Sequence, residues 1–205
     1  MRLAIIGAGG HSKVAANIAH LSGWREISHF DQNKKLFRQN VNGNQILGDI
    51  ETFLEIKDDF DGVFVAIGDN FARHQKINLL KTYNVRLINL VHPSAIIEAG
   101  SILGAGCIFV AGCVVNPNCI INDGVIINTN SCIDHDCVIG AFAHIAPGAV
   151  LAGSVVIGED THVGMSSSIV ENINVGCQVH IAAGAVVTCD IGDFQKVKGI
   201  PARNY

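Results

Sequence analysis

The second half of the chain places one large apolar residue at every sixth position. This series begins at Val91 and runs without interruption through seventeen members to Val187. A small or β-branched residue stands four places after each member, and Gly, Ala, Asn or Asp often follows the member directly. No amphipathic helix has a period of six, and an alternating strand would not keep its phase over this length. The pattern therefore predicts a stack of identical short units that bury one continuous core.

The six-residue period resembles the hexapeptide repeat of left-handed parallel β-helices. In that fold three hexads make one triangular coil, so residues eighteen apart lie directly above one another. Seventeen hexads predict between five and six coils. We expect the large apolar position to stack in the core and the small position to fill the corners.

The first part of the chain has a different pattern, in which short apolar runs alternate with helix-like segments. We expect strands at 3–6, ending near 30–31, at 62–67 and at 85–90, and helices at 12–21 and about 71–83. Strands that alternate with helices predict a small parallel sheet of Rossmann type. The predicted domains are a Rossmann-like domain (1–88), a left-handed β-helix (89–192) and a C-terminal tail (193–205).

The basic residues are distributed as unevenly as the apolar ones. Eleven of the fourteen Lys and Arg residues lie within 1–90, residues 91–195 contain none, and Lys196, Lys198 and Arg203 follow. A net charge of -4 argues against a protein that binds the phosphates of nucleic acids. The apolar stretches are too short to span a bilayer, and the N-terminal run is interrupted before a secretory signal is complete. We therefore expect a cytosolic protein, with neither nucleic-acid binding nor membrane insertion.

Four of the seven cysteines stand at the small position of the hexad, namely Cys107, Cys113, Cys119 and Cys137. A buried Cys behaves as a small hydrophobe, and an odd number of cysteines without a secretory signal argues against a disulfide framework. No CxxC pair occurs, which excludes a zinc ribbon. The sequence predicts structural thiols.

A glycine-rich loop, Gly7 to Ser12, follows the first predicted strand. Such a loop lets backbone N–H groups and a helix N-terminus approach an anion closely. Ser12 replaces the third glycine of the dinucleotide fingerprint, so phosphate binding and a merely tight turn both remain open. Asp31 ends the second predicted strand, where a Rossmann domain places its ribose contact, although exposed carboxylates at strand ends are common.

His135 differs from most other outward-facing residues of the predicted β-helix, which suggest no particular chemistry. It is the only His at the third hexad position; Asp134 and Asp136 flank it, with Pro117 one coil before and Gly153 one coil after. A titratable cluster that breaks a regular pattern is typical of a functional site, although an exposed polar turn is the alternative. A carboxylate beside an imidazole orients it and favours its protonated form, as a general base requires while it removes a proton.

His144, His162 and His180 are eighteen apart and should stack on three successive coils. Three imidazoles could bind zinc, but the coil spacing sets them along a line rather than around a point. We therefore expect no metal site. His144 is predicted to line the same groove as His135, and the other two to be surface or interface side chains.

Several motifs in order are similar to those of the sialic-acid O-acetyltransferase and nucleotide-sugar N-acetyltransferase family, and together they cover essentially the whole chain. They are GAGGH in the first loop, FD at the end of the second strand, AIGDN (66–70), NTNSCIDHDCVIG (128–140) and KGIPAR (198–203). The resemblance implies a homotrimer whose β-helices bind acetyl-CoA in clefts between subunits, while the N-terminal domain holds the sugar acceptor.

The resemblance also implies roles for individual residues. His135 would be the general base and Asp136 the acid that raises its basicity. The acceptor would be contacted by Gly9, Gly10, His11, Asp31 and Gly68, and acetyl-CoA by His144, Met165 and Ala183. Gln32 stands where relatives often have a second acidic residue. From the charge map, Lys196, Lys198 and Arg203 are the cations available to meet the phosphates of coenzyme A.

These observations favour an acetyl-CoA-dependent N-acetyltransferase that acts on the 4-amino group of a UDP-linked amino-deoxy sugar in bacterial glycan biosynthesis. The alternative within the same class is O-acetylation of sialic acid or another sugar. Alternatives from other classes are a zinc-dependent hydratase of carbonic-anhydrase type and a catalytically silent sugar-binding scaffold.

Overall fold

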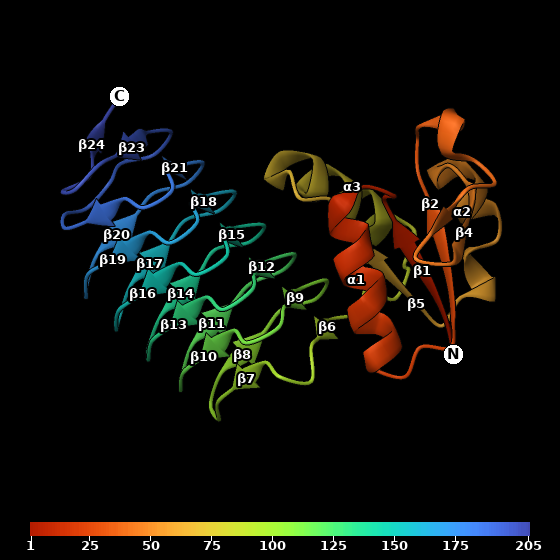
Figure 1. Ribbon diagram of the computed structural model, residues 1–205, viewed down its shortest axis with the longest axis horizontal. Coiled ribbons are helices and arrows are strands. Elements are labelled where there is room, and N and C mark those ends of the chain that lie inside the picture. The colour runs from red at the N-terminus through yellow and green to blue at the C-terminus, as the bar shows by residue number, and fades with distance from the viewer. The chain divides into compact units, whose positions relative to one another are not determined.

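A computed structural model describes residues 1–205, and the chain divides into two compact units, Met1–Pro93 and Ser94–Tyr205. Figure 1 shows helices only in the first unit and a regular ladder of short strands in the second. None of the helices combines the length and the apolar character needed to cross a membrane.

The N-terminal unit is built on a five-stranded sheet in the order β3-β4-β2-β1-β5. Its strands are β1 (Arg2–Ile6), β2 (Glu26–Phe30), β3 (Asn40–Val41), β4 (Asn44–Gly48) and β5 (Gly62–Val65). All neighbours pair in parallel except β3 and β4. The interior strand β1, which lies between β2 and β5, is covered on both faces, which is why Leu3, Ala4 and Ile5 are all apolar and fully buried.

Three helices pack on this sheet: α1 (Gly10–Leu21) on β1, α2 (Ile50–Glu55) on β2 and β4, and α3 (Asn70–Thr82) on β5. Asp49 caps α2 by accepting a hydrogen bond from the Thr52 N–H, and Asp69 caps α3 by accepting one from the Ala72 N–H. Two short 3-10 turns, η1 (Lys34–Leu36) and η2 (Lys57–Asp59), complete the unit.

The predicted elements of this unit need four corrections. Helix α1 begins at Gly10, so His11 lies in its first turn, and β5 ends at Val65 rather than Ile67. Residues 85–89 do not form a strand, because this segment meets the sheet at a single bridge, Val63 to Leu87, and the next strand, β6 (Leu90–Val91), begins only at the last predicted residue. The hairpin of β3 and β4 and the helix α2 were not predicted, although Asn42 and Gly43 supply the left-handed turn that such a hairpin needs.

The second unit is a left-handed parallel β-helix, as the hexads predicted. From β7 to β22, each strand is a residue pair that ends on the large apolar position of one hexad. One face holds β7 (Ile96–Ile97), β10 (Val114–Val115), β13 (Cys132–Ile133), β16 (Val150–Leu151), β19 (Ser168–Ile169) and β22 (Val186–Val187). The next holds β8 (Ile102–Leu103), β11 (Ile120–Ile121), β14 (Val138–Ile139), β17 (Val156–Ile157) and β20 (Asn174–Val175). The third holds β9 (Ile108–Phe109), β12 (Ile126–Ile127), β15 (His144–Ile145), β18 (His162–Val163) and β21 (His180–Ile181).

Residues eighteen apart pair in register on every face, for example Ile97 with Val115 and Val115 with Ile133. The fourth hexad position takes a left-handed backbone from Gly100 to Gly184, which explains its many Gly, Asn, Asp and Ser residues. Asp136 is one of these residues, with φ of 61°. Its side chain therefore starts from a backbone conformation that the turn of the coil imposes.

The C-terminal segment closes the stack. Strand β23 (Lys196–Lys198) pairs in parallel with β21, and β24 (Arg203–Asn204) returns antiparallel to β23. Val197 and Ala202 are buried, whereas the three cations of the segment are exposed. The segment covers the last coil, as the terminal cap of a repeat protein does.

Candidate active site

The loop after β1 is held tightly at its first glycine and is open at the next two. Gly7 has φ of 115°, and a Cβ there would lie 2.9 Å from the carbonyl oxygen of Ala66. Its N–H donates to the Phe30 carbonyl at 2.7 Å, and the buried His29 ring contacts the Gly7 carbonyl through Nδ1 at 3.0 Å. A Cβ on Gly9 or Gly10, by contrast, would meet open space. Gly7 is therefore required by the fold, while Gly9 and Gly10 leave the loop accessible.

Asp31 links this loop to the one that follows β2. Its Oδ2 accepts a hydrogen bond from the Ala8 N–H and its Oδ1 accepts one from the Asn33 N–H, both at 2.8 Å. The carboxylate thus fixes the two loops at the carboxyl ends of neighbouring parallel strands, where open α/β sheets bind ligands.

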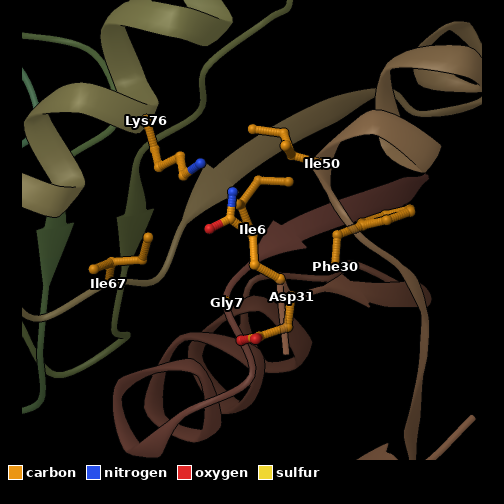
Figure 2. Close-up of a pocket in the computed structure, with 8 residues that line it drawn as sticks. Ile6, Gly7, Phe30, Asp31, Ile50, Ile67 and Lys76 are labelled. Atoms are coloured by element: carbon orange, nitrogen blue, oxygen red, sulfur yellow. The ribbon is translucent and has the colours of Figure 1, made fainter. Parts of the chain in front are cut away.

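A cavity of about 130 Å³ opens at this edge of the sheet (Figure 2). Its lining residues are Ile6, Gly7, Phe30, Asp31, Gln32, Ile50, Ile67 and Lys76. Lys76, which sequence reasoning missed, reaches toward the cavity from α3, whereas the Asp31 carboxylate turns toward the Gly7 loop. Of the residues expected to contact the acceptor, Asp31 lines this cavity, and Gly9, Gly10, His11 and Gly68 do not.

Arg73 organises the loop that contains Gly68. This fully buried side chain donates from Nη1 to the carbonyl oxygens of Ile67 and Gly68, at 3.1 and 3.2 Å, and from Nη2 to Asn70 Oδ1 at 3.0 Å. Burial, helped by the positive charge of Arg73, lowers the pKa of His11 to about 4. His11 is therefore neutral at pH 7 and does not offer a positive charge to a ligand.

His135 stands in the corner between β13 and β14. Its Nδ1 lies 2.8 Å from Asp136 Oδ2, and because an ionised carboxylate can only accept, Nδ1 carries the proton and donates. The backbone N–H of His135 donates to Asp134 Oδ1 at 2.8 Å, and the same oxygen accepts from Asn116 Nδ2 at 2.9 Å. The side chains of His135 and Asp136 are 57% and 53% exposed. The neutral ring consequently presents an unprotonated Nε2 that a substrate can reach.

The electrostatics of this corner favour a protonated ring. The hydrogen bond to Asp136 is the main cause that raises the pKa of His135, and the negative charge of Asp134 adds to it. The pKa of Asp134 is lowered, chiefly by the hydrogen bond from Asn116, so that its charge is maintained. The corner therefore stabilises the imidazolium that forms when His135 accepts a proton.

Cys137, two residues beyond His135, is fully buried, and its thiol donates to the Ala152 carbonyl at 3.3 Å. A hydrogen bond with Cys119 and burial raise its pKa. A thiol held protonated in the core is a poor nucleophile, because the thiolate is the reactive form. The geometry thus agrees with the predicted structural thiols.

The three predicted histidines do form a column on the face of β15, β18 and β21. The ring centroids of His144 and His162 are 4.9 Å apart and perpendicular, and those of His162 and His180 are 5.1 Å apart and stacked. Asn128 Nδ2 lies 3.0 Å from His144 Nε2. Within one chain His144 and His135 stand at different places around the coil, on the β15 face and in the corner after β13, so one chain alone does not form the predicted common groove.

The other residues predicted to contact acetyl-CoA continue along the axis of this column. Met165 and Ala183 are exposed on the two coils after that of His144, each three residues beyond a histidine of the column. Lys196 pairs with His180 and so extends the same row, and Lys198 lies over the Tyr205 ring at 4.3 Å from its centroid. The row thus leads from His144 to the C-terminal cations.

Comparison with known proteins identifies the family. Residues 2–80 match the PglD N-terminal domain. The acetyltransferase domain of PglB from Neisseria gonorrhoeae is 37% identical with a TM-score of 0.94, and the match covers 100% of this chain and 99% of that one. The structure of that domain in complex with acetyl coenzyme A gives 36% identity, a TM-score of 0.95 and coverage of 100% and 98%.

A second enzyme gives the same result. PerB from Caulobacter crescentus, in complex with CoA and GDP-perosamine, is 31% identical with a TM-score of 0.95, and the match covers 100% of this chain and 97% of that one. Matches of this identity extend over the whole length of both chains, through the α/β unit and the β-helix alike. The chain therefore belongs to the hexapeptide-repeat nucleotide-sugar acetyltransferases.

Proposed function

We propose that this protein transfers the acetyl group of acetyl-CoA to the 4-amino group of a UDP-linked amino-deoxy sugar, in the biosynthesis of a bacterial glycan. The observation that carries the proposal is the His135–Asp136 pair, an oriented and exposed imidazole on the β-helix of an acetyltransferase. Support for the amine comes from the relatives, since PerB is a perosamine N-acetyltransferase and was solved with CoA and GDP-perosamine.

In the proposed reaction, Nε2 of His135 takes a proton from the amine while the amine attacks the thioester carbonyl. The Nδ1–H stays bonded to Asp136, whose charge stabilises the imidazolium. An N–H donor stabilises the tetrahedral oxyanion, and collapse of the intermediate forms the amide and releases the coenzyme A thiolate. The proton held on His135 is available to that thiolate, so the step needs no acyl-enzyme.

The acceptor belongs, in this proposal, to the N-terminal unit. The open Gly9–Gly10 loop and the first turn of α1 offer backbone N–H groups to the phosphates. The cavity beside Gly7, Asp31 and Lys76 has the size and mixed polarity to take part of the nucleoside. Neutral His11 and the Gly68 backbone, which Arg73 holds in place, complete the proposed contacts.

Acetyl-CoA would lie along the row that leads from His144 past Met165 and Ala183 to Lys196. No other side chains on these coils carry positive charge, so the phosphates would meet backbone N–H groups, solvent, or the cations Lys196, Lys198 and Arg203. Because one chain does not bring His135 and His144 into one groove, a cleft between copies in a homotrimer is proposed. The exposed Ile102, Ile120 and Val156 on one face are suited to such an interface.

The nucleotide and the acetylated atom are tested together. The protein is incubated with acetyl-CoA and a panel of UDP-, GDP- and dTDP-linked 4-amino sugars, with the corresponding 4-hydroxy sugars and sialic acid as controls. Thiol release is followed, and the product is identified by mass and by its stability to mild alkali, which cleaves esters but not amides. Preferred use of a UDP-4-amino sugar supports the proposal, whereas an alkali-labile product from a hydroxyl acceptor establishes O-acetylation instead.

Metal dependence separates the hydratase alternative from this proposal. General-base transfer through His135 gives neither a metal nor the Cys137 thiol a part in the reaction. Activity should therefore survive exhaustive chelation and the Cys137→Ala substitution. Stoichiometric zinc whose removal abolishes activity would contradict the proposed mechanism.

A further inference from the structure

Gly153 is a glycine that its own backbone does not require. It stands at the third hexad position, where every other hexad from Val91 on carries a side chain, such as Ala99, Pro117 or Met165. Its φ lies outside the left-handed range, in contrast to the glycines of the fourth position such as Gly148. Something other than the backbone conformation must therefore favour glycine at this position.

The space that a side chain would fill is occupied by the ring of His135, one coil earlier. A Cβ on Gly153 would lie 2.6 Å from Cε1, 2.8 Å from Nε2 and 3.3 Å from Nδ1 of that ring. The new Cβ would overlap the ring, since non-bonded carbon atoms prefer a separation of about 3.5 to 4.0 Å. Even alanine at position 153 would force the imidazole to move.

The ring cannot move without losing its present orientation. Nδ1 is tied to Asp136 Oδ2 at 2.8 Å, and the backbone of Asp136 takes the left-handed conformation that the turn of the coil imposes. A shift away from a new Cβ would lengthen or break this hydrogen bond and carry Nε2 away from its position. The position of the imidazole thus depends on the Asp136 carboxylate, which binds Nδ1, and on Gly153, whose backbone lies against the ring without a side chain.

We propose that Gly153 is a positioning residue for acetyl transfer, because its missing side chain leaves the space in which the His135 ring is held with Nε2 ready to accept a proton. This inference rests on the proposed role of His135 as the general base. Gly153 has no side chain and acts through the space that it leaves for His135. The addition of a single methyl group at this position should therefore have a measurable effect.

The first test compares two alanine substitutions in the β-helix. In Gly153→Ala the new Cβ meets an exposed side chain, so the thermal midpoint should stay near that of the parent while kcat falls about 10²-fold, the scale of a misplaced catalytic group. Both KM values should change little. In the control Gly158→Ala, the Cβ would overlap the backbone of Gly176 and Cys177, so this variant should lose thermal stability instead.

A double-substitution cycle shows whether the effect passes through the ring. In the His135→Ala background, adding Gly153→Ala should cause no further loss of the residual rate, because the ring that the methyl group displaces is absent. A Gly153→Ala protein with the parental kcat, or a loss of equal size in both backgrounds, would overturn the proposal. Should Gly153→Ala not fold, the double variant must fold, and its failure would also overturn the proposal.

A titration of the His135 ring by NMR tests the geometry without reference to turnover. In Gly153→Ala the ring should lose its bond to Asp136, and its pKa should fall toward the ordinary value for histidine. An unchanged titration would refute the positioning role. If instead His135→Ala retains full turnover, the proposed function of His135 is wrong, and the titration still decides whether Gly153 positions the ring.

Discussion

In the N-terminal unit the candidate residues lie in loops and helices that each have their own geometry. In the β-helix the candidate side chains stand on one backbone that repeats every eighteen residues. Asp31 is bound by two backbone N–H groups from two different loops. His135 occupies a corner that Pro117 and Gly153 occupy one coil away on either side. The first arrangement can be understood only from the folded loops, and the second from a comparison of one coil with the next.

This difference predicts two kinds of response to substitution. Loop residues such as Gly7 and Asp31 line the cavity and also hold the loops together through their hydrogen bonds. Outward residues of the β-helix can be changed with little effect on the core, since the core is formed by the apolar and small hexad positions. Substitutions in the β-helix should therefore separate catalysis from folding more cleanly.

The largest effect is expected from His135→Ala. The protein should keep its thermal midpoint and its state of association, because the side chain is 57% exposed and outside the core. Its kcat should fall by roughly 10² to 10⁴, the usual contribution of a general base. Steady-state kinetics at saturating substrates and a melting curve measure the two quantities. Near-parental turnover would remove His135 from the mechanism. A large fall in stability would show that outward residues of the β-helix also contribute to folding.

The Asp31→Ala substitution tests the other unit. We expect the KM for the sugar nucleotide to rise roughly 10- to 100-fold, since hydrogen bonds to a charged group contribute about 1.5 to 3 kcal/mol and two loops depend on this one. The KM for acetyl-CoA should stay near the parental value. Thermal stability should fall as well, in contrast to His135→Ala. Equal increases in both KM values would show that the two ligands are not divided between the units.

The same contrast decides what could be predicted from sequence. The hexad placed the second residue of every strand from β7 to β22, because one residue in six must enter the core whatever the rest of the coil does. His135 was visible because it breaks that pattern. The role of Asn116 was also within reach, since it stands eighteen residues before Asp134 and bonds to it. The glycine at position 153 is visible in the sequence, but its role can be inferred only from the position of the His135 ring.

The N-terminal unit was predicted less completely, for physical reasons. The strand at 85–90 was wrong because an apolar run does not by itself give a pairing partner, and within 85–89 only Leu87 forms a bridge to the sheet of this unit. Lys76 and Arg73 lie on the polar-rich helix α3, where a charge is ordinarily solvated. Only the fold brings Lys76 to the cavity and the Arg73 guanidinium to the Gly68 carbonyl. Such contacts join loops and helices that have no fixed spacing in sequence.

A smaller effect, seen in the pH dependence, is expected from Asp136→Asn. In the proposed reaction the neutral ring accepts the proton, so the rate should rise with pH through the pKa of His135, which Asp136 raises chiefly by its hydrogen bond. Asparagine can still accept a hydrogen bond from Nδ1–H, but it removes the negative charge of Asp136, while the charge of Asp134 still acts on the ring. The acidic limb of the profile should therefore move to lower pH, and the plateau should fall because the imidazolium is less stabilised. A profile of kcat/KM from pH 5 to 9 measures both changes, and an unmoved limb would contradict this role for Asp136.

The smallest effect concerns the three cations that end the β-helix. Because Lys196 continues the row of His144, His162 and His180, the anionic end of acetyl-CoA can reach these charges only if it follows that row. Exposed charge pairs contribute only about 0.2 to 1 kcal/mol and weaken as salt is added. Replacing Lys196, Lys198 and Arg203 together with Gln should therefore raise the KM for acetyl-CoA severalfold at low ionic strength, with little change in the KM for the sugar nucleotide. The defect should shrink with added salt, and an acetyl thioester that lacks the phosphates of coenzyme A should serve both proteins almost equally. A variant that uses acetyl-CoA as well as the parent at low salt would show that the row does not lead the coenzyme to the C-terminal segment.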